Sequence, residues 1–192
     1  NWMTDIIHSF HQRYPDINIE LYQGTYADVS YWIKNGIVDI GFLSLSSAGD
    51  LPIEPLYRDP LLCVVPKDYR KREDTPYMTP DEMKDQVFVS QMETTDADIA
   101  IFMKQNGLGN VRMDYHVVDD LSTIALVAAG LGICIMPELV MNDIPYEVHR
   151  YPMMPEAYRV IGISALNPNF LAPAVKMRYQ HVVEKYKTIE EA

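Results

Sequence analysis

Residues 126–137 have the sequence Leu-Val-Ala-Ala-Gly-Leu-Gly-Ile-Cys-Ile-Met-Pro, and this stretch decides the fold prediction. The apolar positions leading into it predict a helix over residues 121–129, which Asp119 or Asp120 can cap. Gly130 supplies the left-handed backbone conformation that ends such a helix. The apolar residues 133–136 then predict a buried strand. A helix joined by a tight turn to a buried strand indicates an α/β protein.

The same alternation extends through the rest of the chain. Strands are predicted over residues 17–21, 37–43, 61–65, 87–90, 111–118, 148–151 and 159–165. Helices are predicted over the first segment up to Pro15, after a Thr25–Asp28 capping box, after Thr79, over residues 96–106 behind a cap at residues 94–96, and from Pro173. Residues 17–43 then form a right-handed strand–helix–strand unit. This order predicts an α/β protein with mostly parallel sheets.

The composition excludes several classes of protein. With 48% apolar and 22% charged residues among 192, the chain has the composition of a soluble folded protein, not of a collagen, a coiled coil or a disordered segment. No apolar run approaches the length of a membrane span. Acidic residues outnumber basic ones by 27 to 16, which gives a formal charge of −11. Direct nucleic-acid binding, which depends on clustered Lys and Arg, is therefore disfavoured.

The two cysteines are predicted to be free and buried. Cys63 and Cys134 each lie within an apolar run that predicts a strand, where a thiol behaves as a small hydrophobic side chain. Free buried thiols suit the reducing cytoplasm. No signal peptide is evident, although the first residue is Asn1 and not Met. We therefore expect a cytoplasmic protein.

The order of these signals resembles LysR-type transcriptional regulators. The resemblance is carried by Phe-His-Gln-Arg-Tyr-Pro-Asp-Ile at residues 10–17, Gly24 with residues 32–41, Asp-Pro-Leu-Leu-Cys-Val-Val-Pro at residues 59–66, and residues 126–137. Four segments in the right order at the right separations are far more specific than any one of them. The resemblance spans about residue 5 to residue 186.

The resemblance implies the effector-binding domain of such a regulator, with a fold like a type 2 periplasmic binding protein. Two Rossmann-like α/β lobes would be joined by two crossover strands, with a small-molecule cleft between them. From the composition break after Pro66 and the return strand at residues 159–165, lobe I is expected over residues 1–66 and 164–192, and lobe II over residues 67–163. The winged helix-turn-helix, the linker helix, the first strand and its Ser/Thr-bearing turn would lie outside this chain.

Ligand contacts are expected where strands end and helices begin, because free backbone N–H groups gather there. Three such junctions give the predicted ligand-binding residues Leu43, Ser44, Ser90, Gln91, Met92, Thr94, Thr95, Asp119, Leu121 and Ser122. For each Ser or Thr, a plain cap or loop role is the competing interpretation. The set offers hydroxyls and one amide but no Arg or Lys. The effector is expected to be a small carboxylate held by the helix N-termini, or a neutral or polar metabolite.

Catalysis and metal binding have little support in the sequence. Asp119 and Asp120 are better explained as a helix cap than as an acid–base pair, since adjacent residues of an extended segment point to opposite faces. His8 and His11 have a spacing that permits metal ligation, but no clear third ligand accompanies them. No nucleophile elbow, phosphate loop or dinucleotide fingerprint is present. We expect no enzyme activity, no metal and no cofactor.

The functional prediction is a ligand-sensing, dimerising domain of a bacterial LysR-type regulator. It would bind DNA only through the missing N-terminal domain, and would not bind membranes. A homodimer, or a tetramer of the full-length protein, is expected to form through residues 2–13 and 96–106, which carry more apolar side chains than one buried face requires. The alternative is a type 2 solute-binding protein of a transporter, which a signal peptide before Asn1 would indicate.

Overall fold

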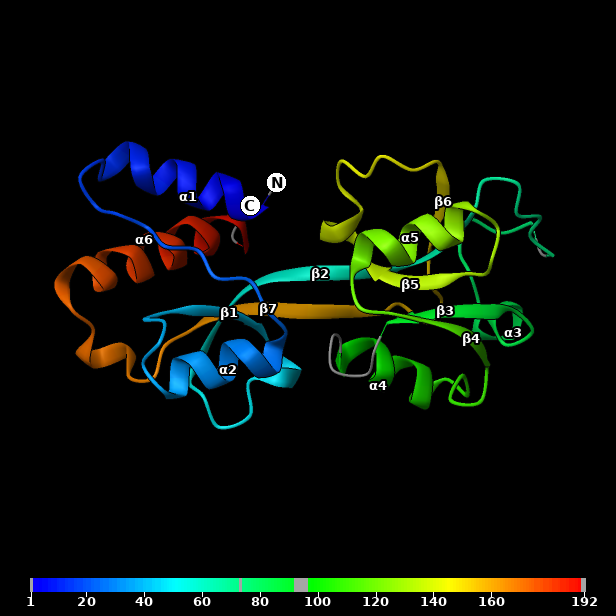
Figure 1. Cartoon of the computed structure of the whole chain (residues 1–192), viewed down its shortest axis with the longest axis horizontal. Helices are drawn as coiled ribbons and strands as arrows, with labels where there is room; N and C mark the ends of the chain where they lie inside the picture. The colour runs from blue at the N-terminus through cyan, green and yellow to red at the C-terminus, as the bar shows by residue number, and fades with distance from the viewer. Residues whose placement is uncertain (1, 73, 92–96, 191–192) are drawn as a thin grey trace. The chain divides into compact units, whose positions relative to one another are not determined.

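The computed structural model describes residues 2–72, 74–91 and 97–190 (Figure 1). The helices are α1 (Trp2–Arg13), α2 (Tyr26–Lys34), α3 (Pro80–Met83), α4 (Ala97–Gln105), α5 (Asp120–Ala128) and α6 (Pro173–Glu190). The strands are β1 (Gly41–Ser44), β2 (Ile53–Pro66), β3 (Val87–Gln91), β4 (Arg112–Val117), β5 (Cys134–Pro137), β6 (Val148–Pro152) and β7 (Tyr158–Ser164). Short 3-10 helices follow β1 (Leu45–Ser47) and β5 (Glu138–Met141) and precede α6 (Pro168–Phe170). The α/β class predicted from the sequence is confirmed.

The chain divides into two compact units. Unit 1 comprises Asn1–Arg58 and Val160–Ala192, and unit 2 comprises Asp59–Arg159. Both divisions fall inside strands, so β2 and β7 each continue from one unit into the other. The boundaries predicted from the sequence, after residues 66 and 163, lie further along the same two strands. The assignment of the units as lobes of an effector domain stays a prediction.

The sheets are less parallel than the alternation of elements predicts. In the described chain, β3 and β4 form a parallel pair, whereas β1 pairs with β7, and β2 pairs with β5 and β6, in antiparallel ladders. One sheet has the order β1-β7-β2-β5, with β6 on β2, and the other is β3-β4. The prediction of mostly parallel sheets is therefore wrong. It assumed that strands joined by a helix are neighbours, but the long strands β2 and β7 pair with strands that are distant in the sequence.

The predicted strand over residues 17–21 is also wrong. This segment, between α1 and α2, is extended but belongs to no strand. Its alternation of apolar and polar residues is present, but within the described residues no ladder pairs with it. A strand requires a neighbouring strand as well as a pattern. The strand–helix–strand unit predicted over residues 17–43 is therefore reduced to α2 followed by β1.

Local signals in the sequence place α2. The Thr25 hydroxyl accepts a hydrogen bond from the backbone N–H of Asp28 at 3.1 Å, and the Asp28 carboxylate accepts one from the N–H of Thr25 at 2.9 Å. This reciprocal capping box satisfies backbone donors that a helix start leaves free. The pKa of the Asp28 carboxyl is lowered by the hydrogen bonds from Thr25. The helix begins where the sequence predicts.

Unit 2 has a core on both sides of its strands. Along β2, Leu61, Cys63 and Val65 enter one buried cluster, which α4 covers with Phe102 and Met103. Leu62 and Val64 enter a second cluster, which α5 covers with Ile124 and Val127. Successive side chains of a strand point to opposite faces, so a continuous apolar run can fill two clusters at once. Cys63 and Cys134 belong to different clusters and are both free and buried, as predicted.

The glycine turn after α5 is confirmed in detail. Gly130 has a φ of +82°, the left-handed conformation that glycine adopts without strain. A Cβ atom on Gly132 would lie 2.5 Å from the carbonyl oxygen of Val87. That oxygen accepts a hydrogen bond from the N–H of Ile133 at 2.9 Å, and the N–H of Val89 donates to the Ile133 oxygen at 2.9 Å. The absence of a side chain at Gly132 therefore lets this segment lie against β3.

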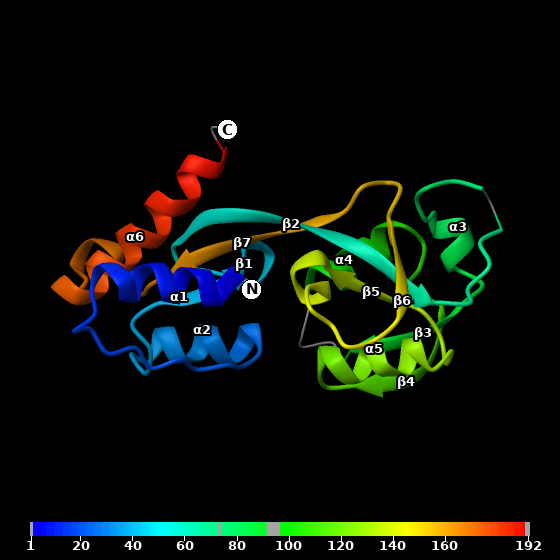
Figure 2. The ribbon, with the colours of Figure 1, turned by 90° about the horizontal axis from the view of Figure 1, so that it is seen from above.

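Unit 1 has a smaller core. One buried cluster joins Ile6 of α1, Leu56 of β2, Ile163 of β7, and Val182 and Tyr186 of α6. The helices α1 and α6 run side by side, as both views show (Figure 2). A second cluster forms around α2 and β1 and contains Ile33, Leu43 and Leu51.

The charged residues that follow Pro66 do not all lie in a solvated loop. Lys71 has a side chain only 9% exposed, and its Nζ lies 3.0 Å from Oε2 of Glu82, which is 1% exposed. The same ammonium group donates to the Thr75 hydroxyl at 2.7 Å. Lys67, by contrast, lies on the surface, where its Nζ pairs with Oε2 of Glu147 at 2.9 Å. Part of the run is therefore anchored to α3.

Candidate ligand-binding site

The parallel pair β3–β4 brings two of the three predicted junctions together. Ser90 lies opposite His116, and Gln91 lies opposite Val117, at the carboxyl ends of the two strands. The segments that follow both strands therefore leave the sheet at the same edge. In α/β proteins, ligands bind at this edge. The structure thus places the second and third junctions as neighbours within unit 2.

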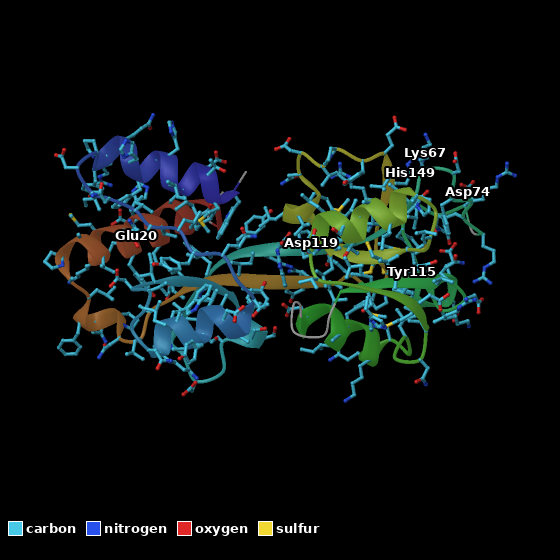
Figure 3. The ribbon with its side chains drawn as sticks, in the orientation of Figure 1. Glu20, Lys67, Asp74, Tyr115, Asp119 and His149 are labelled. Carbon is cyan, nitrogen blue, oxygen red and sulfur yellow. The ribbon has the colours of Figure 1, made fainter. Side chains whose placement is uncertain are left out.

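The third junction is built by a helix cap. After β4, Val118 is 69% exposed, and Asp119 then caps α5 (Figure 3). The Asp119 carboxylate accepts a hydrogen bond from the N–H of Ser122 at 2.9 Å, and the Asp119 carbonyl accepts one from the Thr123 hydroxyl at 2.9 Å. Leu121, in the first turn, is 52% exposed. The junction presents an apolar surface beside a carboxylate.

The electrostatics of this junction follow from the cap. Hydrogen bonds from Ser122, the backbone N–H first, lower the pKa of the Asp119 carboxyl. The group is therefore anionic at neutral pH, and the interpretation of Asp119 as a helix cap is confirmed. Asp120 adds a second carboxylate to the same helical turn. Two negative charges oppose an anion at this helix start, but their oxygens can accept hydrogen bonds from hydroxyl or amide donors of a ligand.

The second junction is described only in part. Ser90 is half-buried near the end of β3, and the backbone of Gln91 completes that strand. The predicted contacts Met92, Thr94 and Thr95 lie outside the described residues. The helix expected after them is present as α4, which begins at Ala97 in the described chain.

The first junction belongs to unit 1. Leu43 and Ser44 are both fully buried, and the Leu43 side chain packs in the cluster with Ile33 and Leu51. The Ser44 hydroxyl lies 3.1 Å from the Ser46 hydroxyl. Leu45, which follows, is 47% exposed. The role of Leu43 and Ser44 as ligand contacts stays a prediction, and the Leu43 side chain already has a place in the core.

Two exposed apolar residues at these junctions were not predicted as contacts. The sequence predicts Val118 as the end of the preceding strand, and it places Leu45 at the first junction, directly after Leu43 and Ser44, but not in the set of ligand-binding residues. The available signal was position, because each directly follows the last residue of a strand. Exposed apolar side chains at a strand end are what an apolar part of a ligand contacts.

Neither metal ligands nor a membrane span were found in the described part of the chain. Among residues 2–72, 74–91 and 97–190, no group of three or more His, Cys, Asp or Glu side chains could hold a metal ion. Nε2 of His8 lies 3.0 Å from Nε2 of Gln12, one turn along α1. None of the helices described is both long enough and apolar enough to cross a bilayer.

Comparison with known proteins gives the family. A family profile described as "LysR substrate binding domain" matches residues 1–185. An uncharacterized HTH-type transcriptional regulator of Bacillus subtilis (strain 168), YybE, is 30% identical over 195 residues, which cover 96% of this chain and 63% of YybE. Among solved structures, the effector-binding domain of QuiR in complex with shikimate has a TM-score of 0.84 at 19% identity and covers 97% of this chain and 90% of that one. The BenM effector-binding domain with its effector benzoate has a TM-score of 0.81 at 20% identity, covering 100% of this chain and 89% of that one.

The chain belongs to the LysR substrate-binding domain family, and its fold is that of LysR effector-binding domains. The resemblance inferred from the four sequence segments is confirmed. The regulator interpretation is favoured over the transporter solute-binding protein, because the curated relatives are transcriptional regulators. The chain spans about 63% of the length of YybE and 59% of a second B. subtilis regulator, YoaU.

Proposed function

We propose that this chain is the ligand-sensing domain of a cytoplasmic LysR-type transcriptional regulator. A small-molecule effector binds at its strand-to-helix junctions and controls DNA binding by an N-terminal winged helix-turn-helix of the full-length protein. The observation that carries the proposal is the pairing of β3 with β4, which sets Ser90 and Asp119 at one sheet edge. The family match and the effector-bound neighbours support it.

The two carboxylates at the start of α5 indicate which functional groups the effector carries. Because Asp119 and Asp120 are acceptors, the part of the effector nearest α5 carries hydroxyl or amide donors. A carboxylate on the effector would sit away from α5, at another backbone N–H cluster. The proposed effector is therefore a small polar molecule with donor groups, either neutral or bearing one carboxylate.

Calorimetric titration tests this proposal with two probes taken from the neighbouring structures. Shikimate carries hydroxyls and a carboxylate, whereas benzoate carries a carboxylate alone. We expect shikimate to bind more tightly, and Leu121→Asp to weaken its binding about tenfold or more by adding a charge at the site. Leu131→Asp is the matched control, since Leu131 is an exposed leucine just beyond the other end of α5. Equal losses in both variants, or binding of benzoate alone, would contradict the proposal.

The domain is also proposed to form dimers through α1 and α4. Ile101 of α4 is 44% exposed, which is unusual for a large apolar residue in a helix that already buries Phe102 and Met103. An isologous pair would bury such a surface twice. Ile101→Asp should then convert a dimer to a monomer in analytical ultracentrifugation, whereas Gln105→Asp on the same helix should not. A wild-type protein that sediments as a monomer at about 100 μM would contradict the proposal, because a standard-size interface holds well below that concentration.

A further inference from the structure

Polar side chains of unit 1 meet where α1 and α6 lie side by side (Figure 2). The Ser9 hydroxyl of α1 donates a hydrogen bond to the carbonyl oxygen of Ile6 at 3.0 Å, one turn earlier in the same helix. The Ser9 oxygen lies 3.0 Å from Nε2 of His181 and 3.1 Å from Nζ of Lys185, and both of these residues belong to α6. One hydroxyl oxygen of α1 is therefore shared by two nitrogens of α6.

The direction of these hydrogen bonds follows from the protons available. A serine hydroxyl has a single proton, and Ser9 donates it to the Ile6 carbonyl. An ammonium group can only donate, so Lys185 donates to Ser9. Because the Ser9 proton is already used, Nε2 of His181 also carries a proton and donates it. Two donors thus converge on one neutral oxygen, at a point where an anionic oxygen would be the stronger acceptor.

Positive charge gathers at the same point, in a chain whose formal charge is −11. Arg13 follows Ser9 by one turn of α1, and Lys185 follows His181 by one turn of α6. Burial, and then the charges of Arg13 and Lys185, lower the pKa of the His181 imidazole. The charge of Glu184 opposes this change. Within the described residues, none of the three cationic side chains forms an ion pair with a carboxylate.

These groups are held in place and are open to solvent. The Lys185 ammonium group donates a second hydrogen bond to the Asp5 carbonyl oxygen at 3.0 Å, which fixes it between the two helices. Ser9, His181 and Lys185 are half-buried, whereas Arg13 is exposed. The Asp5 and Glu184 side chains, the acidic ones next to these contacts, are also exposed, so water screens their charges. An anion from solvent can therefore reach donors that are already oriented.

We propose that Ser9, Arg13, His181 and Lys185 form a binding site for a small oxyanion of the phosphate class. The oxyanion accepts hydrogen bonds from Lys185 and His181 in place of the Ser9 oxygen, and Arg13 contacts it from the solvent side. An ammonium group supplies a compact charge and a guanidinium group supplies paired donors, a combination that suits phosphate oxygens. The bound ion links α1 to α6 and stabilises unit 1 by mass action. The site lies within unit 1, and its test does not depend on the proposed effector.

Nuclear magnetic resonance of the histidine rings tests the proposal, with inorganic phosphate as the probe. A bound anion favours the protonated imidazole, so the pKa of His181 should rise by about half a pH unit or more in about 10 mM phosphate, compared with chloride at equal ionic strength. His149, an exposed histidine of β6, is the internal reference and should not change. An unchanged pKa of His181, or an equal rise in both histidines, would overturn the proposal.

Two variants of α6 make the test specific to this site. Lys185→Gln and Lys176→Gln remove the same charge from the same helix, but Lys185 contacts Ser9, whereas the Lys176 side chain is exposed. Lys185→Gln should raise the phosphate concentration needed for the His181 change about tenfold or more, and Lys176→Gln should leave it unaltered. Lys185→Arg, which keeps the charge and the donors, should restore binding. Equal weakening in the two Gln variants would reduce the effect to net charge and contradict a defined site.

Discussion

Helices cover the core of unit 2 on both faces of its strands, whereas unit 1 has an apolar groove of about 550 Å³ that is lined in part by Gly41 and Phe42 of β1. In unit 2, α4 and α5 cover opposite clusters, and the segment after Gly132 lies directly against β3. In unit 1, residues 17–21 have the pattern of a strand, but no ladder of the described structure includes them. The contrast shows that apolar periodicity makes a strand only where a neighbouring strand supplies the other half of each hydrogen bond.

The units also differ in their buried charges. Lys71 and Glu82 form an almost fully buried ion pair in unit 2. Asp59 is completely buried, and its carboxylate accepts hydrogen bonds from Arg159 at 2.8 Å and from the N–H of Leu139 at 3.0 Å. Burial raises the pKa of Asp59, and Arg159 opposes that change. Unit 2 therefore depends on polar contacts that are costly to break.

The largest expected effect comes from the ion pair of unit 2. Lys71→Ala leaves the Glu82 carboxylate buried without its ammonium partner, and should lower the free energy of unfolding by about 3–5 kcal/mol. Lys67→Ala is the control, because Lys67 pairs with Glu147 on the surface, where such pairs contribute about 1 kcal/mol or less. Urea unfolding measures both variants. Similar losses for the two lysines would show that burial of the Lys71–Glu82 pair is unimportant.

A smaller loss of unfolding free energy is expected when alanine replaces a tightly packed glycine, and each unit contains such a glycine. Gly132→Ala in unit 2 places a Cβ 2.5 Å from the Val87 oxygen, a backbone atom held by the bridge to Ile133. The expected cost is about 1–3 kcal/mol, as for other overpacked core sites.

In unit 1, the nearest atoms to a Cβ added by Gly41→Ala belong to the side chains of Val29 and Ile33, at 2.6 and 2.8 Å. Side chains can rotate more easily than backbone can shift, so this variant should cost less than Gly132→Ala. Urea unfolding measures the loss of unfolding free energy in both variants. A larger loss for Gly41→Ala than for Gly132→Ala would mean that unit 1 is packed as rigidly as unit 2.

The smallest expected effect is a dependence of stability on pH that arises from His181 in unit 1. Burial, with the charges of Arg13 and Lys185, lowers the pKa of His181, whose ring nitrogen lies 3.0 Å from the Ser9 hydroxyl. Protonation is therefore penalised only in the folded chain. The contribution of His181 to stability is complete above the ordinary histidine pKa of about 6.5 and decreases as the pH falls below it.

Thermal unfolding at pH 7 and at pH 5.5 measures this dependence. In His181→Gln, the difference in thermal stability between pH 7 and pH 5.5 should be smaller than in the unmodified chain. His149→Gln should not, because that side chain is exposed on β6 (Figure 3). An unchanged pH dependence in His181→Gln would exclude the role of this histidine.

Much of the architecture could be predicted from local sequence. The capping box at Thr25, the cap at Asp119 and the glycine turn at Gly130 depend on contacts within a few residues, and all three are present. The apolar runs around Cys63 and Cys134 likewise predicted buried strands with free thiols. Of the candidate site, the sequence predicted the helix start at Asp119 but not the exposed Val118 beside it, because exposure depends on what packs nearby.

By itself, the sequence determined the class of fold, the order of its helices and strands apart from the strand expected at residues 17–21, and the family, because short-range patterns and motif order carry that information. Only the tertiary structure decided which strands pair, that Lys71 is buried, and that the ends of β3 and β4 meet at one edge. It also decided that residues 17–21 join no ladder among the described residues. The physical reason is that hydrogen-bond partners and burial are supplied by residues distant in the sequence, and no local pattern specifies them.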